Sequence, residues 1–315
     1  MKMLSRIADS MYWLGRYMER SEGMLRMLHT QYVLSLDKSP SELNSMQSLL
    51  HVFSNLQNEK EALKPATAHQ IIQFLLIEPK NENSLRILLN KARENARGMQ
   101  DHITKEVWEQ VNQMYHIINN PKTVSQLQNN EGLPVIESLL KNCLLYTGIT
   151  DATMPRGMGW NFMGLGKFTE RTLLTLELGD FFFESIQYDL NQNKDILYWR
   201  NLLFSLSGYE FHLKNYRNFD YNFNVLHQVM LHPQFPHSVL YCLGRMRNYL
   251  NQVIGENNSP MNAPLLNQFG RLISQVEYAD VEYIRRDNLK KFLHDTKSSI
   301  YPFTHTLGQT FFDYY

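Results

Sequence analysis

The chain has 315 residues, and its 31 Lys and Arg residues balance its 31 Asp and Glu residues, so the formal net charge is zero. A neutral chain has no overall field that attracts nucleic acid or an anionic membrane, and we expect neither as a partner. Charged residues interrupt each apolar stretch before it reaches the length of a signal peptide or a membrane span, which predicts a cytoplasmic protein.

Apolar residues recur with the period of an α-helix along almost the whole chain, and no segment shows the alternation typical of a half-buried strand. The first predicted helix begins at Ser5, and further helices of the first half are predicted at 40–56, 66–77, 84–119 and 134–147. After a loop at 154–159, helices are predicted from Trp160 and at 196–205, 238–254, 264–276 and 280–312, the last with a kink at Pro302. The sequence therefore predicts an all-α helical bundle.

Two pairs of similar segments indicate an internal duplication. Residues 14–21 (LGRYMERS) resemble residues 165–172 (LGKFTERT) at an offset of 151. Residues 84–94 (SLRILLNKARE) resemble residues 238–248 (SVLYCLGRMRN) at an offset of 154. Two matches in the same order and at nearly equal offsets predict a duplicated ancestral half. The predicted halves, related by a pseudo-twofold and packed as one body, are 1–149 and 150–315.

Each copy of the first segment places a glycine inside a helix, one turn before a Glu-Arg pair. These glycines are Gly15 and Gly166. A glycine in a helix interior costs roughly 0.5–1 kcal/mol relative to alanine. Its presence in both copies predicts that another helix or a ligand passes close to the backbone at this point.

The charged residues of the two copies are candidates for a functional site. The plain interpretation is a solvated helix face, but the second copy has two leucines where the first has Glu22 and Gly23, so its helix is apolar on most sides. Charges on a buried helix must be paired. We therefore expect a partly buried ionic network, which either stabilises the fold or binds a ligand. The network residues are Glu19, Arg20, Glu170 and Arg171, and the neighbouring candidates for substrate binding are Arg16 and Lys167.

Four further arginines are weaker candidates for binding an anion. Arg93 and Arg97 share one face of a predicted helix, and Arg247 is the repeat equivalent of Arg93. A row of arginines can bind carboxylates or phosphates bidentately, although a solvated face is the commoner arrangement. Arg156 lies in a loop that leads into a helix N-terminus, which is either an anion site or a plain connection. The histidines lack metal-ligand spacing and no di-iron Glu-x-x-His motif occurs, so we expect no metal site.

Several segments together resemble the bacterial alpha-E domain family. They are 3–20, 92–97 (ARENAR), 156–160 (RGMGW) and 165–171 (LGKFTER). The resemblance covers essentially the whole chain, and its N-terminal string is specific. The family pattern often has Ala-Glu after the first Glu-Arg, whereas this chain has Ser21-Glu22 and, in its second copy, Thr172-Leu173. This departure argues against a catalytic role for Glu22.

The resemblance implies association with a circularly permuted ATP-grasp protein, often with a transglutaminase-like or other peptidase encoded nearby. Such sets of proteins are thought to make and cut amide bonds on peptides or small amines. ATP and magnesium are then expected on the partner, because this chain has no nucleotide-binding motif of its own.

Three roles remain open. In the first, the chain is a non-ATP-binding helical subunit of a peptide or amide ligase system, and its Glu-Arg segments line an interior cleft that holds a carboxylate- or amine-bearing substrate. In the second, it is a non-catalytic scaffold that docks the ATP-grasp and peptidase partners, and the Glu-Arg network is purely structural. In the third, Glu19 or Glu170 is a general base, which the adjacent arginines disfavour because they lower the pKa of a carboxyl group.

Overall fold

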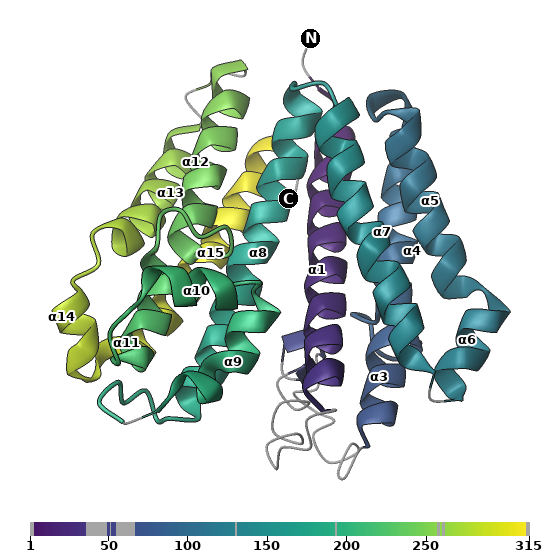
Figure 1. Ribbon diagram of the computed structural model, residues 1–315. Helices are drawn as coiled ribbons and strands as arrows, with labels where there is room; N and C mark the ends of the chain where they lie inside the picture. Colours follow the sequence, from purple (N-terminus) through teal and green to yellow (C-terminus); the bar gives the residue numbers. More distant parts are fainter. Residues whose placement is uncertain are drawn as a thin grey trace. The chain divides into compact units, whose positions relative to one another are not determined.

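The computed structural model describes residues 3–35, 49–50, 52–54, 67–129, 131–192, 194–256, 259 and 262–312, and within them every regular element is a helix (Figure 1). The predicted all-α class is therefore confirmed. The chain divides into two compact units. The middle unit is Tyr17–Pro155, and the terminal unit combines Met1–Arg16 with Arg156–Tyr315. Helix α1 (Ser5–Ser35) contributes to both, because the division falls inside it.

Among its described residues, the middle unit contains the C-terminal part of α1 and the helices α3 to α7. These are α3 (Ala68–Ile77), α4 (Leu85–Gly98), α5 (Lys105–Asn119), α6 (Pro121–Gln128) and α7 (Gly132–Thr153). Helix α4 packs against α5, and α5 packs against α7. Each of these helices turns an apolar face inward, and Leu89, Val111 and Leu139 are fully buried between them.

The structure corrects several predicted boundaries in the middle unit. The helix predicted at 84–119 is wrong as one element, because α4 ends at Gly98 and a 3-10 turn, η1 (Gln100–His102), separates it from α5. The Thr104 side chain accepts a hydrogen bond from the Val107 N–H at 3.4 Å and so caps a new helix. The predicted end at Asn119 is confirmed, because α5 ends there and Pro121 occupies the first turn of the next helix, α6. The helix predicted at 40–56 lies largely outside the described residues.

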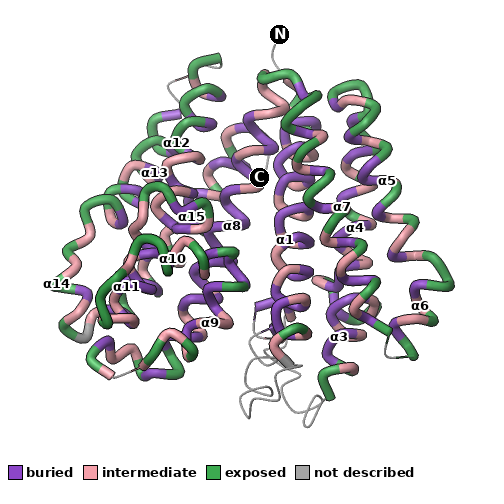
Figure 2. The backbone as a smooth tube through the Cα atoms, in the orientation of Figure 1, coloured by how far each residue is buried: buried purple, intermediate pink, exposed green. Residues whose placement is uncertain are grey.

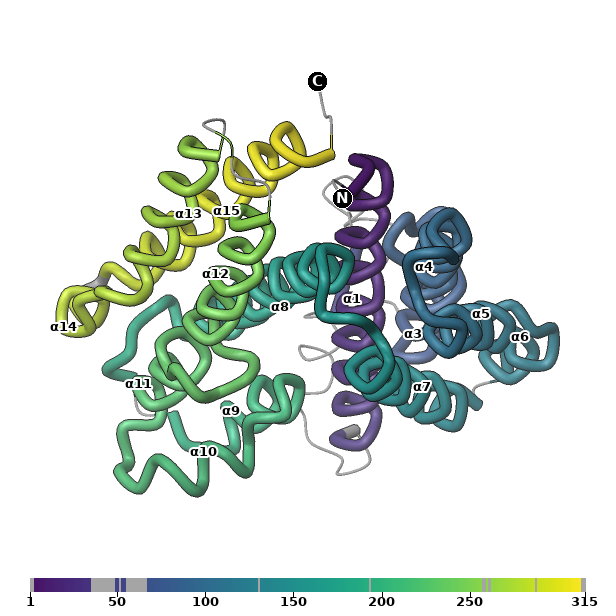
Figure 3. The backbone as a smooth tube through the Cα atoms, turned by 90° about the horizontal axis from the view of Figure 1, so that it is seen from above, coloured from purple at the N-terminus to yellow at the C-terminus, as the bar shows by residue number. Residues whose placement is uncertain are grey.

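The terminal unit contains the N-terminal part of α1 and all the remaining helices. These are α8 (Met158–Glu184), α9 (Ile196–Ser205), α10 (Tyr209–Asn215), α11 (Tyr221–Leu226), α12 (Val239–Glu256), α13 (Asn262–Glu277), α14 (Val281–Tyr283) and α15 (Leu289–Phe311), with π-helical segments η2 (His227–Leu231) and η3 (Ile284–Asn288). Helix α8 packs along α12, and α13 packs along α15, as Figure 3 shows from above. Pro302 lies inside α15, which continues to Phe311.

Helix α8 is the central element of the terminal unit. Most of its residues are buried, including polar ones such as Thr169, Thr172 and Thr175, and Figure 2 shows this along the tube. The prediction that the second copy of the duplicated segment is enclosed on most sides is therefore confirmed. A charge on this helix has little access to water, so its partners must come from the protein.

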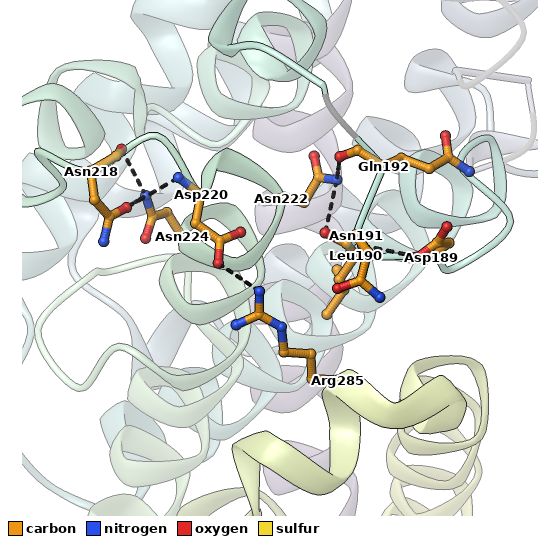
Figure 4. A network of polar contacts seen from close by, with 9 residues as sticks. All are labelled: Asp189, Leu190, Asn191, Gln192, Asn218, Asp220, Asn222, Asn224 and Arg285. Carbon is orange, nitrogen blue, oxygen red and sulfur yellow. Dashed lines mark hydrogen bonds and ion pairs between the residues drawn. The ribbon is translucent and has the colours of Figure 1, made fainter.

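A network of asparagines and aspartates fixes the loops at one end of the terminal unit (Figure 4). The Asn222 amide donates to the carbonyl oxygens of Leu190 and Gln192, at 3.2 and 2.7 Å, and accepts from the indole N–H of Trp199 at 2.8 Å. Arg285, in η3, pairs with Asp220 at 3.0 Å. The polar groups of Asn222 and Arg285 are thus engaged in contacts within the protein. The network therefore positions α11 and η3 and is not a ligand-binding site.

The predicted repeat would make α1 equivalent to α8 and α4 equivalent to α12. The duplicated segments lie on α1 and α8, and the second pair of segments lies on α4 and α12. Helix α4 packs on α5 as α12 packs on α13, and α5 packs on α7 as α13 packs on α15. The compact units differ from the predicted halves 1–149 and 150–315, because the chain divides at Pro155 and the first sixteen residues join the second half. Duplication remains our inference from these correspondences.

Candidate functional site: charges around a glycine crossing

Helices α1 and α8 touch backbone to backbone at the two glycines of the duplicated segment. A Cβ atom added at Gly15 would lie 2.2 Å from the carbonyl oxygen of Met163. A Cβ atom added at Gly166 would lie 1.9 Å from the carbonyl oxygen of Tyr12. Only glycine permits so close an approach. The sequence left open whether a helix or a ligand passes here, and the structure assigns the place to a helix.

The contact is reciprocal. The Gly15 position faces Met163 and Lys167, and the Gly166 position faces Tyr12 and Arg16. Each glycine thus faces two residues of the other helix. One lies three positions before the glycine of that helix, and the other lies directly after it. Such an arrangement, in which patch i meets patch j and j meets i, is the pattern of an isologous two-fold contact. The repeated sequence therefore packs against itself within one chain.

Arg16 and Glu170 form an ion pair beside this crossing. The Arg16 Nε and Nη2 atoms donate to one carboxylate oxygen, Oε2 of Glu170, at 2.8 and 2.7 Å. The Glu170 side chain is only 2% exposed and that of Arg16 is 18% exposed. Burial by itself lowers the pKa of Arg16, but the Glu170 carboxylate and the Tyr12 hydroxyl together more than offset this and raise the pKa above its ordinary value. The Arg16 guanidinium is therefore charged throughout the physiological pH range.

Aromatic side chains enclose the Arg16 end of the pair. The guanidinium carbon lies 4.8 Å from the centre of the Trp13 ring and 5.9 Å from that of Tyr12. Tyr12 is buried, and its hydroxyl lies near Thr169 and Arg16. Burial raises the pKa of Tyr12, and the Arg16 charge opposes this. Protein side chains thus cover most of the Arg16 guanidinium, which is expected of a structural pair.

The second arginine of the repeat, Arg171, points towards the loop before α12. Its Nη1 atom donates to the carbonyl oxygen of Pro236 at 3.3 Å, and one turn later Thr175 donates to the carbonyl oxygen of His237 at 2.9 Å. The Arg171 guanidinium carbon also lies 5.3 Å from the centre of the Phe168 ring. Arg171 thus holds a loop in place and brings a positive charge to an aromatic cluster.

The first-copy residues Glu19 and Arg20 lie in the middle unit. Arg20 donates to the carbonyl oxygen of Val52 at 3.1 Å, and Glu19 is 5% exposed. Glu22 pairs with Arg26 at 2.5 Å. Burial, followed by the nearby Glu22 and Glu19 charges, raises the pKa of the Cys143 thiol well above its ordinary value.

Arg93 and Arg247 play matching parts in their units. The Arg93 Nε atom donates to Asn112 on α5 at 2.8 Å, which ties α4 to α5. Arg247 pairs with Glu277 on α13 at 3.3 Å, which ties α12 to α13. Each arginine thus has a partner on the neighbouring helix, and the Arg93 side chain is 22% exposed whereas that of Arg247 is 47% exposed. They do not join the Arg16–Glu170 pair among the described contacts.

The remaining candidates are more exposed. Arg97 is 65% exposed and lies 3.7 Å from Glu94. The exposed Arg156 stacks on Trp160, with its guanidinium carbon 3.8 Å from the ring centre. Lys167 takes part in the glycine crossing through its backbone nitrogen. Within the described residues, the structure finds no group of three His, Cys, Asp or Glu side chains close enough to hold a metal ion.

Sequence reasoning missed a cationic and aromatic cluster around Phe168. Arg245, Tyr241 and Tyr249 on α12 surround this ring. One feature of the sequence pointed to this cluster, because the second pair of similar segments has a cation at equivalent positions, Lys91 and Arg245. A cation shared by the two segments does not indicate which aromatic ring it contacts. The matched spacing of Phe168 and Tyr17 in the first segment supplies that ring.

A family model for a predicted alpha-helical domain with a conserved ER motif matches residues 3–312. The chain belongs to the Alpha-E family. Glu19-Arg20 and Glu170-Arg171 are its two ER dipeptides. Among curated proteins, the chain is similar to an uncharacterized protein of Mycobacterium bovis, with 19% identity over 94% of this chain and 35% of that protein. An uncharacterized protein of Mycobacterium tuberculosis shows 18% identity with the same coverage.

The Alpha-E chain therefore spans about a third of the length of the curated relatives it matches. No solved structure shows a significant match. In the part of the Alpha-E chain that the structure describes, no helix is both long enough and apolar enough to cross a membrane.

Proposed function

We propose that this Alpha-E protein is a non-ATP-binding helical subunit of a peptide or amide ligase system, working with a circularly permuted ATP-grasp partner. The partner supplies ATP, magnesium and the activated acyl group, and the helical chain binds or positions a carboxylate- or amine-bearing substrate. A transglutaminase-like peptidase is a further member of the proposed set. Because such chemistry uses cellular ATP, we place the system in the cytoplasm.

The observation that carries this proposal is the length of the relatives. A segment that corresponds to 94% of this chain makes up only 35% of the mycobacterial proteins. In those proteins the Alpha-E segment is thus covalently joined to other sequence, which raises the local concentration of the two parts for one another. We infer that the Alpha-E segment of this protein likewise works together with other sequence, either on the same chain or on an associated partner.

The alternative role, a non-catalytic scaffold, is favoured by one specific observation. The Arg16–Glu170 pair lies beside a crossing of two helix backbones, and Glu170 is almost fully buried. A charge pair in this position contributes to fold specificity, and removing one partner leaves the other uncompensated. We therefore assign this pair a structural part in both roles, and we look for the substrate site elsewhere in the chain.

The experiment is co-purification followed by an ATP-turnover assay. The tagged chain is expressed with the products of its neighbouring genes, and ADP release is measured for the chain, for the partner and for the mixture, with candidate amines and peptides. We expect turnover only when an ATP-grasp partner is present and a rise in turnover when the Alpha-E chain is added. Isothermal titration of the isolated chain with Mg-ATP serves as the control. Micromolar binding to the isolated chain would contradict the partner-borne ATP site.

A further inference from the structure

Arg245, in the middle of α12, is a partly buried cation without a carboxylate partner among the described residues. Its Nη2 atom donates to the hydroxyl of Tyr249 at 2.8 Å. Its Nε atom is enclosed and has no hydrogen-bond partner. Arg247, two residues along the same helix, has a Glu277 partner at 3.3 Å. The two arginines of α12 thus differ in both burial and pairing.

Aromatic rings surround the Arg245 guanidinium. Its central carbon lies 5.6 Å from the centre of the Phe168 ring and 5.2 Å from that of Tyr249. These two rings are themselves nearly parallel, with their centres 6.0 Å apart. On Phe168 the Arg171 guanidinium lies 5.3 Å from the ring centre. Two guanidinium groups therefore lie near one ring, and each weakens the net stabilisation that the ring gives to the other.

The structure leaves room for this arrangement. A Cβ atom at Gly164 of α8 would lie 2.6 Å from the Tyr249 ring, so the glycine allows the ring to lie against the helix. The Tyr249 hydroxyl accepts the Arg245 N–H, and its own hydrogen has no described acceptor. Arg245 and Tyr249 thus present two donors, one of them charged, in the same partly buried place. Donors of this kind complement an oxyanion.

The other unit carries a cation at the corresponding position. Lys91 is the repeat equivalent of Arg245, and Tyr17 is that of Phe168. The Lys91 ammonium lies 6.0 Å from the centre of the Tyr17 ring. The pairing of cation and ring therefore occurs in both units, but only in the terminal unit is the cation a guanidinium with an enclosed nitrogen atom.

We propose that Arg245 and Tyr249, with the charge of Arg171 close by, form a binding site for an oxyanion of the carboxylate or phosphate class. Binding gives the partly desolvated Arg245 a charge partner, which a buried guanidinium otherwise lacks. That the anion is the carboxylate of a ligase substrate rests on the proposed function. The binding of an oxyanion does not, because it follows from the contacts of Arg245 and Tyr249.

The test is an anion titration of the full chain at constant ionic strength, with chloride as the balancing ion. The probes are inorganic phosphate and N-acetylglycine, which carries a single carboxylate. When the anion concentration is about ten times the dissociation constant, binding should raise the melting temperature by about 3–6 °C. Arg245→Met should abolish the rise, and Tyr249→Phe should weaken binding several-fold. The matched control Arg247→Gln, on the same helix, should keep the full rise.

A spectroscopic measurement covers the case in which Arg245→Met does not fold. The side-chain Nε–H resonance of Arg245 in the wild-type chain is assigned by its loss in Arg245→Lys, and it should shift on addition of the anion. A larger response to N-acetylglycine than to phosphate identifies a carboxylate site, and the reverse identifies a phosphate site. An equal melting-temperature rise in wild type and Arg245→Met, or an unchanged Nε–H resonance at saturating anion, would overturn the proposal. Because no partner or ATP is present, these outcomes are independent of the ligase assay.

Discussion

Replacing Gly166 by alanine tests the backbone contact between α1 and α8. The added methyl carbon would lie 1.9 Å from the carbonyl oxygen and 2.8 Å from the carbonyl carbon of Tyr12. Unstrained contacts between carbon and a carbonyl oxygen are about 3.3–3.6 Å long. Both contacted atoms belong to the backbone, so the clash cannot be relieved by a side-chain rotation. The two helices would have to separate by about 1 Å or more, which also disturbs the Arg16–Glu170 pair.

The expected free-energy change follows from two opposing contributions. Overpacking a close-packed site costs about 1–3 kcal/mol, occasionally more. Alanine in a helix interior is favoured over glycine by roughly 0.5–1 kcal/mol. Because the clash is with backbone, the upper end of the first range applies. We expect Gly166→Ala to lower the free energy of unfolding of the terminal unit by about 2 kcal/mol or more.

The measurement is urea unfolding of the full chain, followed by circular dichroism. Gly179→Ala is the matched control, because Gly179 lies on the same helix and a Cβ atom there would meet nothing within 4 Å. We expect this control to be neutral or slightly stabilising. Gly15→Ala should resemble Gly166→Ala, and the double variant should lose less than the sum, since one separation of the helices relieves both clashes. Equal stability of Gly166→Ala and Gly179→Ala would refute the backbone contact.

Three further outcomes are expected. Glu170→Gln should lower the melting temperature by several degrees, because it leaves the partly buried Arg16 without its anion; Arg16→Met in the same chain should restore part of the loss, and no loss in the single variant would contradict a structural pair. Burial lowers the pKa of His212, and burial together with the nearby His232 lowers that of His227. The folded chain therefore binds fewer protons than the unfolded chain at mildly acidic pH. The contribution of these histidines to stability is full above about pH 6.5 and declines as the pH falls through their lowered pKa values. Melting curves at pH 7.5 and 5.5 should show this decline, and a flat profile would be evidence against it. Glu19→Gln should affect partner-dependent ATP turnover more than it affects the melting temperature if the first role is correct, and the opposite ratio would favour the scaffold.

Much of the helical layout could be predicted from periodicity, and the failures have identifiable physical causes. The helix at 196–205 has the predicted bounds, because Asp195 caps its first turn and a polar turn ends it. The break between α4 and α5 was missed, since apolar spacing resumes in phase after the 3-10 turn. Helices α10 and α11 are short and held by tertiary contacts such as those of Asn222, which leave no periodic signal.

Candidate site residues were predictable where a repeated charge accompanied a repeated glycine. The Glu170 side chain is buried and paired as expected for an enclosed helix, and Arg16 of the other copy is a partner. Spacing along one helix cannot indicate a partner on another helix 154 residues away. The contact of Arg245 with Phe168 was beyond sequence reasoning for the same reason, because it depends on how α12 lies along α8.

The division of the chain inside α1 has a consequence for any attempt to dissect the protein. A fragment cut at the apparent midpoint, beginning at Arg156, would carry α8 without the stretch Met1–Arg16 that supplies Gly15 and Arg16. The backbone of α8 at Gly166 would lose its contact with α1, and Glu170 would lose the Arg16 guanidinium. Such a fragment should be rescued by adding a peptide of the first sixteen residues, so the N-terminus behaves as a detachable complement to a domain that begins 140 residues later.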